Sequence, residues 1–272
     1  MIEINKNYNE NCLDTMAKMP GNFIDLTVTS PPYDGLRTYN GYSFTFEDIA
    51  KELFRITKEG GIVIWIVNDS KVNGSKTLTS FKQALYFKEI GFNMHDVMFW
   101  EKSTFNAPKP NVYHNVIEYI FVLSKGKPKT FNPIFDRKNI HSGRSVNPSI
   151  RYSDGRTEKR TTKTINEFGK RFNIWKISEV KNNKEKSHPA PYPIKLVIDL
   201  VVSWSNENDL VYDCFNGSGT TSEACIKINR NFIGSEISSE YCNIIEERIK
   251  KAWEEKRKEK DLQAGTLFGD EM

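Results

Sequence analysis

Short apolar runs and longer stretches of helical spacing alternate along the first 123 residues of the chain. An unbroken apolar run is typical of a buried strand in a parallel sheet, and apolar residues three or four positions apart are typical of a helix that covers it. The alternation therefore predicts an α/β fold with a mostly parallel sheet and allows an antiparallel strand at one edge. The expected strands are residues 1–4, 23–28, 62–67, 96–100 and 116–123, and the expected helices are residues 13–18, 46–58 and 73–90, with a loop at 5–11 and Gly60-Gly61 as a helix C-cap.

The pattern breaks between Ser124 and Ser187, where apolar runs are short and Asn, Ser, Thr and Arg are frequent. Any local core there must come from six aromatic residues, namely Phe131, Phe135, Tyr152, Phe168, Phe172 and Trp175. Beyond it we expect helices at 194–203, 220–228 and 238–260, strands at 210–213 and 231–236, and a frayed last dozen residues. The chain thus divides into residues 1–123, an insertion at 124–187, and residues 188–272.

Length and composition favour a globular protein with one large domain or one domain carrying an insertion, since the chain has 272 residues. It contains no apolar run long enough to cross a bilayer and no charged-then-apolar leader at Met1, so we expect a cytoplasmic protein. Its four cysteines form no C-x-x-C pair, which favours buried free thiols over a metal site or a disulfide framework.

Positive charge is concentrated in the insertion. Residues 125–186 contain 17 Lys and Arg against 6 Asp and Glu, a balance of +11, whereas the rest of the chain carries 22 against 29, a balance of −7. A basic block in an otherwise acidic protein suggests a surface for a polyanion such as nucleic acid. A solvated charged loop is the alternative.

The first candidate site is Thr29-Ser30-Pro31-Pro32-Tyr33, directly after the expected strand 23–28. Two prolines end a strand, so this loop lies at a carboxyl end, where open α/β sheets bind ligands. Ser30, the backbone carbonyls and the flat ring of Tyr33 suit a planar group that carries an amine. Residues 34–46, which include Arg37, are expected to form a flexible loop over this site; a merely rigid turn is the alternative for the Pro-Pro pair.

The second candidate site joins Asp213, Gly217 and Gly219 to Glu236, which ends the following strand 23 positions after Asp213. Glycines let the backbone turn tightly against a ligand, and an acid at that spacing can accept hydrogen bonds from both ribose hydroxyls. A dinucleotide-binding site is the rival interpretation. The turn lacks that motif's third glycine and has Thr220-Thr221 instead.

Three motifs together resemble those of the amino-methylating DNA methyltransferases in their β arrangement. Residues 213–221 are similar to D-P-F-x-G-S-G-T-T, residues 29–33 to the catalytic T-S-P-P-Y, and His188 to Pro193 to H-P-A-x-F-P. Cys214 replaces the usual proline, and Asn11 replaces an acid in a position that reaches adenine in the family. The resemblance implies a permuted, Rossmann-like methyltransferase fold that binds S-adenosyl-L-methionine, with residues 1–123 as the catalytic half, 188–272 as the cofactor half and the insertion as the target-recognition region.

The residues this resemblance assigns form two groups. The catalytic group is Ser30, Pro31, Pro32 and Tyr33, and the cofactor-binding group is Asn11, Cys12, His188, Pro189, Ala190, Asp213, Phe215, Gly217, Ser218, Gly219, Thr220, Thr221 and Glu236. No metal is expected.

The implied reaction transfers a methyl group to the exocyclic amine of a base flipped out of double-stranded DNA. Serine before the proline pair favours cytosine N4, with adenine N6 as the alternative. A bacterial or phage origin and a cognate restriction endonuclease are implied, and the protein is either a monomer or a homodimer. A non-catalytic nucleic-acid-binding protein of the same fold and an NAD-dependent enzyme are further alternatives.

Overall fold

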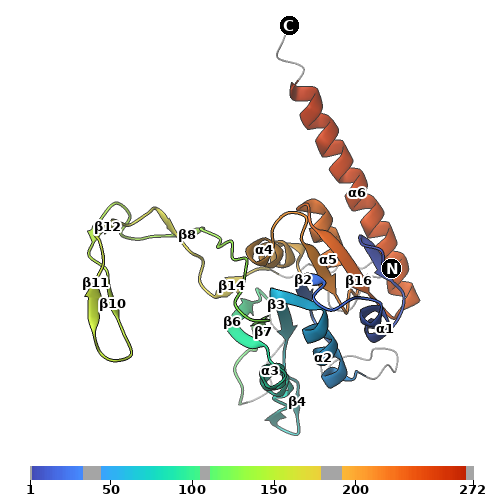
Figure 1. Cartoon of the computed structure of the whole chain (residues 1–272), viewed down its shortest axis with the longest axis horizontal. Helices are drawn as coiled ribbons and strands as arrows, with labels where there is room; N and C mark the ends of the chain where they lie inside the picture. The colour runs from blue at the N-terminus through green and yellow to red at the C-terminus, as the bar shows by residue number, and fades with distance from the viewer. Residues whose placement is uncertain (1, 33–43, 105–110, 179–191, 268–272) are drawn as a thin grey trace. The chain divides into compact units, whose positions relative to one another are not determined.

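A sheet of eight strands forms the centre of the computed structural model, which describes residues 2–32, 44–104, 111–178 and 192–267 (Figure 1). Neighbouring strands run parallel except β7, which is antiparallel to both β3 and β6. In spatial order the strands are β1 (Lys6–Tyr8), β16 (Asn231–Ser235), β15 (Leu210–Asp213), β2 (Ile24–Thr29), β3 (Thr57–Val67), β7 (Ile117–Ser124), β6 (Asn93–Glu101) and β14 (Ile174–Lys176). The α/β prediction is confirmed, but the antiparallel strand lies inside the sheet, between β3 and β6.

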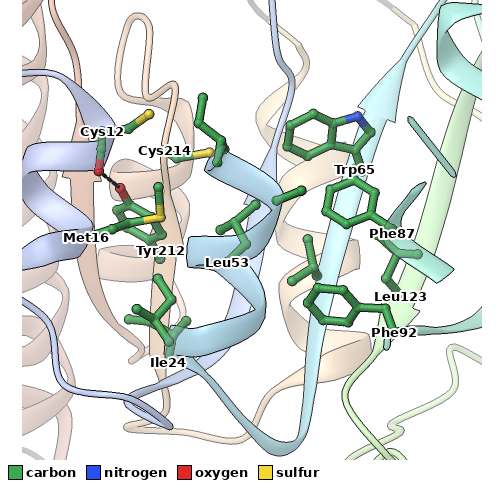
Figure 2. Packing of buried hydrophobic residues seen from close by; sticks show 14 of the residues in the cluster. Cys12, Met16, Ile24, Leu53, Trp65, Phe87, Phe92, Leu123, Tyr212 and Cys214 are labelled. Carbon is green, nitrogen blue, oxygen red and sulfur yellow. Dashed lines mark hydrogen bonds between the residues drawn. The ribbon is translucent and has the colours of Figure 1, made fainter. Parts of the chain in front are cut away.

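Helices cover both faces of this sheet. Strand side chains alternate between the faces, so Val63 and Trp65 join one core, of which Figure 2 labels Trp65, Leu53 and Phe87. Ile62 and Ile64 are buried on the other face. Helices α1, α2 and α3 supply the first core; α4, α5 and α6 pack side by side over the second face. Their bounds are α1 (Cys12–Ala17), α2 (Phe46–Ile56), α3 (Thr79–Glu89), α4 (Ile194–Trp204), α5 (Thr220–Lys227) and α6 (Ser239–Leu267).

Five local predictions are wrong. The first strand is the polar edge segment β1 rather than residues 1–4, and part of the expected loop 5–11 is therefore strand. The pair Gly60-Gly61 does not cap a helix: it lies inside β3, where the register with β2 shifts, and a Cβ on Gly61 would come within 2.9 Å of the Lys58 carbonyl oxygen. The helix expected at 73–90 begins at Thr79, and α6 continues to Leu267, so residues 261–267 of the end expected to fray are helical.

An Asn-Gly turn explains the late start of α3. Residues 71–76 form the hairpin of β4 (Lys71–Val72) and β5 (Ser75–Lys76), with Asn73 at φ 47° and Gly74 at φ 82°. Two successive residues with positive φ match the twist of a two-residue hairpin, and Asn-Gly is the strongest sequence signal for one.

Residues 133–173 form a second compact unit, called here the arm, distinct from the central unit of residues 1–132 and 174–272. Three short antiparallel pairs are nested along it, so the arm is a single long hairpin whose turn lies between β10 and β11 (Figure 1). The pairs are β8 (Arg137–Lys138) with β13 (Phe168–Gly169), β9 (Ser145–Val146) with β12 (Lys163–Thr164), and β10 (Ser149–Arg151) with β11 (Thr157–Lys159).

The six aromatic residues of the expected insertion do not build a local core. Phe135, Tyr152, Phe168 and Phe172 are exposed in the arm, which buries none of its side chains. The other two belong to the central unit: Trp175 lies in β14, and Phe131 packs on Trp204 with ring centroids 4.7 Å apart. Residues 124–132 and 174–178 of the expected insertion are thus parts of the central unit.

No helix among the residues that the structure describes is long and apolar enough to cross a membrane.

Candidate active site

The ends of β2 and β15 meet where the winding of the sheet reverses. From β15 the chain passes through α5 to β16 on one side, and from β2 it passes through α2 to β3 on the other side. Ligands of open α/β sheets bind at such a switch point, beyond the carboxyl ends of the strands. Both candidate loops, residues 30–33 and residues 214–219, begin at this place.

A buried carboxylate joins the two strand ends. Asp213 accepts hydrogen bonds from Thr29 Oγ1 (2.7 Å), Thr221 Oγ1 (2.6 Å), Tyr192 Oη (2.8 Å) and the backbone N–H of Phe215 (3.0 Å). Burial raises the pKa of this carboxyl above its ordinary value, and the hydrogen bonds from Thr221, Thr29 and Tyr192 oppose that rise. With four protein donors, the carboxylate fixes the positions of the loops around it.

Glycines shape the loop between β15 and α5. Gly217 and Gly219 have φ of 54° and 81°, a region that residues with a Cβ avoid, and a Cβ on Gly219 would press on Ile245 at 3.2 Å. Arg248 of α6 holds the loop from behind, since its Nη1 donates to the Ser218 carbonyl oxygen (2.8 Å) and lies 3.1 Å from the hydroxyls of Ser218 and Thr220. Those two hydroxyls therefore bind α6.

Glu236 follows β16 and faces the same loop. One carboxylate oxygen accepts from Gly217 N–H and the other from Ser238 N–H, each at 2.9 Å. Burial raises the pKa of Glu236, while these backbone donors lower it. Each oxygen has two lone pairs, so one backbone bond leaves each oxygen able to accept another donor.

Asn11 and Cys12 lie at the start of α1, next to the edge that carries Glu236. The Asn11 side chain accepts from Leu13 N–H at 2.9 Å and so caps the helix, which gives this residue a structural task. Cys12 is buried, and burial raises its pKa to about 12. The Glu236 N–H bonds to the Tyr8 carbonyl oxygen at 3.0 Å, which brings the segment before Asn11 to this strand end.

The loop predicted to be catalytic leaves β2 in a half-buried position. Ser30 is partly exposed, Pro31 is buried and Pro32 is partly exposed. Phe215 packs nearby, edge-on to Phe44 with centroids 5.5 Å apart. Outside the described residues lie Tyr33, residues 34–43 of the expected loop 34–46, which include Arg37, and the motif residues His188, Pro189 and Ala190.

The cysteines of the chain are buried, and burial raises the pKa of each thiol. The Cys214 thiol lies 3.5 Å from Thr29 Oγ1. A protonated thiol is a poor nucleophile, so these side chains are suited to packing. In the described parts of the chain, no group of three or more His, Cys, Asp or Glu side chains is placed to hold a metal.

The sequence did not predict a role for three side chains of this site, those of Thr29, Tyr192 and Arg248. The first two lie inside recognised motifs, and only the buried bonds to Asp213 reveal their role. Arg248 lies in a helix rich in both charges, where the sequence gives no signal that separates it from exposed neighbours. Its ion pair with Glu223, at 2.7 Å, crosses from α6 to α5.

The geometry fits a nucleoside cofactor. The glycine turn lies at the start of α5, and Glu236 retains acceptor capacity beside it for ribose hydroxyls. The residues that would hold S-adenosylmethionine are therefore those of the Phe215–Gly219 loop and Glu236.

Comparison with known proteins gives concordant matches. A family model described as "DNA methylase" matches residues 24–247. The chain is 51% identical to the orphan methyltransferase M.BamHII of Bacillus amyloliquefaciens, over 84% of this chain and 89% of that protein. It is 29% identical to the type II methyltransferase M1.MboII of Moraxella bovis, over 89% and 95% of the two chains.

Solved structures share the fold. The PvuII cytosine-N4-specific DNA methyltransferase superposes with a TM-score of 0.65 at 19% identity, covering 92% of this chain and 91% of that one. A modification methylase of Thermus thermophilus complexed with S-adenosyl-L-methionine superposes with a TM-score of 0.61 at 22% identity, covering 91% and 95%. With the family match, these findings dispose of the NAD-dependent alternative: the chain belongs to the N4/N6 amino-methylating DNA methylase family and is an S-adenosylmethionine-dependent DNA methyltransferase.

Proposed function

We propose that this methyltransferase modifies the N4 amine of cytosine within a specific sequence of double-stranded DNA. The observation that carries the proposal is the Thr29–Asp213 hydrogen bond at 2.7 Å, because it holds the loop that begins with Ser30 against the loop of the cofactor glycines. Serine before the proline pair favours cytosine N4 over adenine N6. The similarly folded PvuII enzyme is named as cytosine-N4-specific, which agrees with this choice.

Ser30 and Pro31 would prepare the amine for reaction. The lone pair of an exocyclic amine is delocalised into its ring, so the nitrogen is a weak nucleophile. The Ser30 hydroxyl and the Pro31 carbonyl each accept one N–H of the amine, which draws the nitrogen towards a tetrahedral geometry. When bound, S-adenosylmethionine would supply an electrophilic methyl group and keep on its sulfur the electron pair of the broken S–C bond. The amine nitrogen would gain the methyl group and lose one proton to solvent. Alignment of this kind is worth roughly 7–11 kcal/mol of barrier.

Other residues hold the reactants. Tyr33 would stack on the extruded base, a contact worth about 1–3 kcal/mol. Glu236 would accept the ribose hydroxyls, and Phe215 would contact the cofactor. Asp213 and Arg248 act as positioning residues, because their polar atoms bind the loops and not the reacting groups.

The arm is the proposed target-recognition element. It carries ten Lys and Arg against four Asp and Glu between residues 133 and 173, and its aromatic residues are exposed. The type II names of relatives favour a restriction endonuclease as partner, whereas the orphan name of the 51% identical relative favours an enzyme that acts without one. We expect action in the cytoplasm, where bacterial DNA lies.

Expression in a bacterial host free of DNA methylation, followed by sequencing for modified bases, tests this proposal. We expect 4-methylcytosine at one sequence motif. Ser30→Ala should abolish modification while calorimetry shows unchanged S-adenosylmethionine binding, and Ser75→Ala in the exposed β4–β5 hairpin is the matched control. Modification restricted to 6-methyladenine would overturn the base assignment, and equal loss of binding and turnover in Ser30→Ala would overturn the role of the loop.

A further inference from the structure

The arm is a protein segment without a hydrophobic core. None of its residues 133–173 is buried, and its order comes from short ladders and local polar contacts. An isolated two-stranded ribbon is marginally stable in water. The arm therefore has a large surface available for a partner, and its net charge of +6 makes that partner a polyanion.

A two-stranded ribbon has dimensions that suit duplex DNA. The major groove, about 12 Å wide, admits such a ribbon, and it is the groove in which all four base pairs present different donor and acceptor patterns. Base-edge contacts then come from side chains at the ribbon's end or along one face. The end of this ribbon is the turn of residues 152–156, between β10 and β11.

The turn is fixed by its own hydrogen bonds. Tyr152 N–H donates to the Arg156 carbonyl oxygen (2.8 Å) and Gly155 N–H donates to the Tyr152 carbonyl oxygen (3.0 Å), with Gly155 at φ 85°. The Tyr152 hydroxyl donates to Glu158 at 2.6 Å, across the base of the turn. A loop that is ordered in advance loses less entropy when it binds.

Asp154 orients the Arg156 side chain within this turn. Its carboxylate accepts from Arg156 N–H (3.0 Å) and from Arg156 Nε (2.6 Å), and the guanidinium lies 5.6 Å from the centroid of the Tyr152 ring. The ion pair with Asp154 uses Nε of Arg156. The two terminal nitrogens form another edge of the guanidinium. That terminal edge can donate two parallel hydrogen bonds, as guanine O6 and N7 require.

We propose that Arg156 reads one guanine of the target sequence from the major groove, with Asp154 and Tyr152 holding its guanidinium in place. This inference rests on the proposed function, since it names how the recognition element selects DNA. Arg137 and Arg171 have other tasks near the arm's base, because Arg171 pairs with Asp136 and Arg137 donates to the Lys170 carbonyl oxygen. Arg160, exposed just beyond β11, provides a comparison of equal charge.

The first experiment compares Arg156→Gln with Arg160→Gln in the full chain, expressed in the methylation-free host. We expect Arg156→Gln to modify sites with any base pair at one former G·C position of the motif. Arg160→Gln should keep the motif and lower the fraction of sites modified, because a phosphate contact carries no sequence information. An unchanged motif in Arg156→Gln, or a motif without a G·C pair, would overturn the inference.

The second experiment measures binding and does not depend on turnover. Duplexes carrying the wild-type motif receive 7-deazaguanine, which lacks the N7 acceptor, at each guanine in turn. We expect wild-type affinity to fall about tenfold at one position and Arg156→Gln to show no fall there. Inosine at the same position removes only the minor-groove amine and should leave both affinities unchanged.

Two results separate the possible failures. Wild-type affinity that is insensitive to 7-deazaguanine at every position refutes the role of Arg156 even if the variant is inactive. Failure of the proposed function shows itself differently, as host DNA that the wild-type protein leaves unmodified or marks only with 6-methyladenine.

Discussion

The central unit and the arm are built on opposite principles. The central unit buries whole strands on both faces and even buries polar groups such as Asp213, whereas the arm buries nothing and depends on ladders and ion pairs at its surface. A buried frame fixes reacting groups at constant positions, which a transfer reaction needs. A surface-built ribbon gains stability from what it binds, which suits recognition of a long polyanion.

The same residue type illustrates this contrast in two places. Asp213 accepts four hydrogen bonds in the interior, and Asp154 accepts two from Arg156 in the open. Asp213→Ala should lower the free energy of unfolding by about 3 kcal/mol or more, since it leaves buried hydroxyls without an acceptor. Urea denaturation measures this loss, and methylation should disappear with it.

Asp154→Ala is the matched control, and we expect it to shift the unfolding transition far less, because Asp154 is exposed and solvent replaces most of the lost contacts. Equal destabilisation by the two substitutions would abolish the distinction between the units.

Limited trypsin digestion tests the stability of the two units directly. The ten Lys and Arg of the arm should be cut at least about tenfold faster than those in the described parts of the central unit, because opening a coreless ribbon costs little. Duplex DNA containing the target motif should protect the arm; mass spectrometry of the first fragments identifies the sites. First cuts within β3 or α2 would contradict the comparison.

A smaller effect is expected from Arg248→Ala, which removes the support behind the glycine loop. We expect the KM for S-adenosylmethionine to rise several-fold and the unfolding free energy to fall by about 1 kcal/mol, with kcat little changed. Arg257→Ala, on the exposed part of the same helix, should change neither. A loss confined to kcat would place Arg248 in the chemistry instead.

The pH dependence of stability should differ in sign between the two aspartates. The Asp213 pKa is raised by burial, so its contribution to stability is complete below its ordinary value of 3.8 and is lost as pH rises through the raised value. The Asp154 pKa is lowered by its bonds from Arg156, so its contribution is present above 3.8 and is lost as pH falls.

Unfolding of the wild type, Asp213→Asn and Asp154→Asn between about pH 3 and 6 measures these contributions. The wild-type advantage should shrink with rising pH against Asp213→Asn and grow slightly against Asp154→Asn. The same pH trend for both variants would show that burial does not control the pKa of Asp213.

The sequence predicts the elements of the central unit better than those of the arm, for physical reasons. Apolar runs in the sequence predict buried strands such as β3. The motif loops directly follow such runs, so their place at the carboxyl ends of strands was predictable. Edge strand β1 and the arm's ladders bury little, so they leave no periodic pattern. The aromatic residues of the insertion suggested a core because aromatic residues are usually buried, and here they are exposed.

The details of the site were less predictable for a different reason. The motifs predict Asp213 and Glu236 as cofactor-binding residues, and in the structure both bind the protein's own loops. Spacing cannot distinguish a group that touches a cofactor from one that positions the loop around it. Arg248, 30 residues away from its partner Ser218, shows the same limit.

The Thr29–Asp213 bond also has a consequence for biosynthesis. Its residues are 184 positions apart, and β15 and β16 enter the sheet between β1 and β2, which were made far earlier. At about 5–20 residues per second, the ribosome needs roughly ten seconds or more to supply them after β2 emerges. During that interval β1 lacks β16 and β2 lacks β15. The carboxylate that binds Thr29 does not yet exist, so the proposed methylating site cannot form.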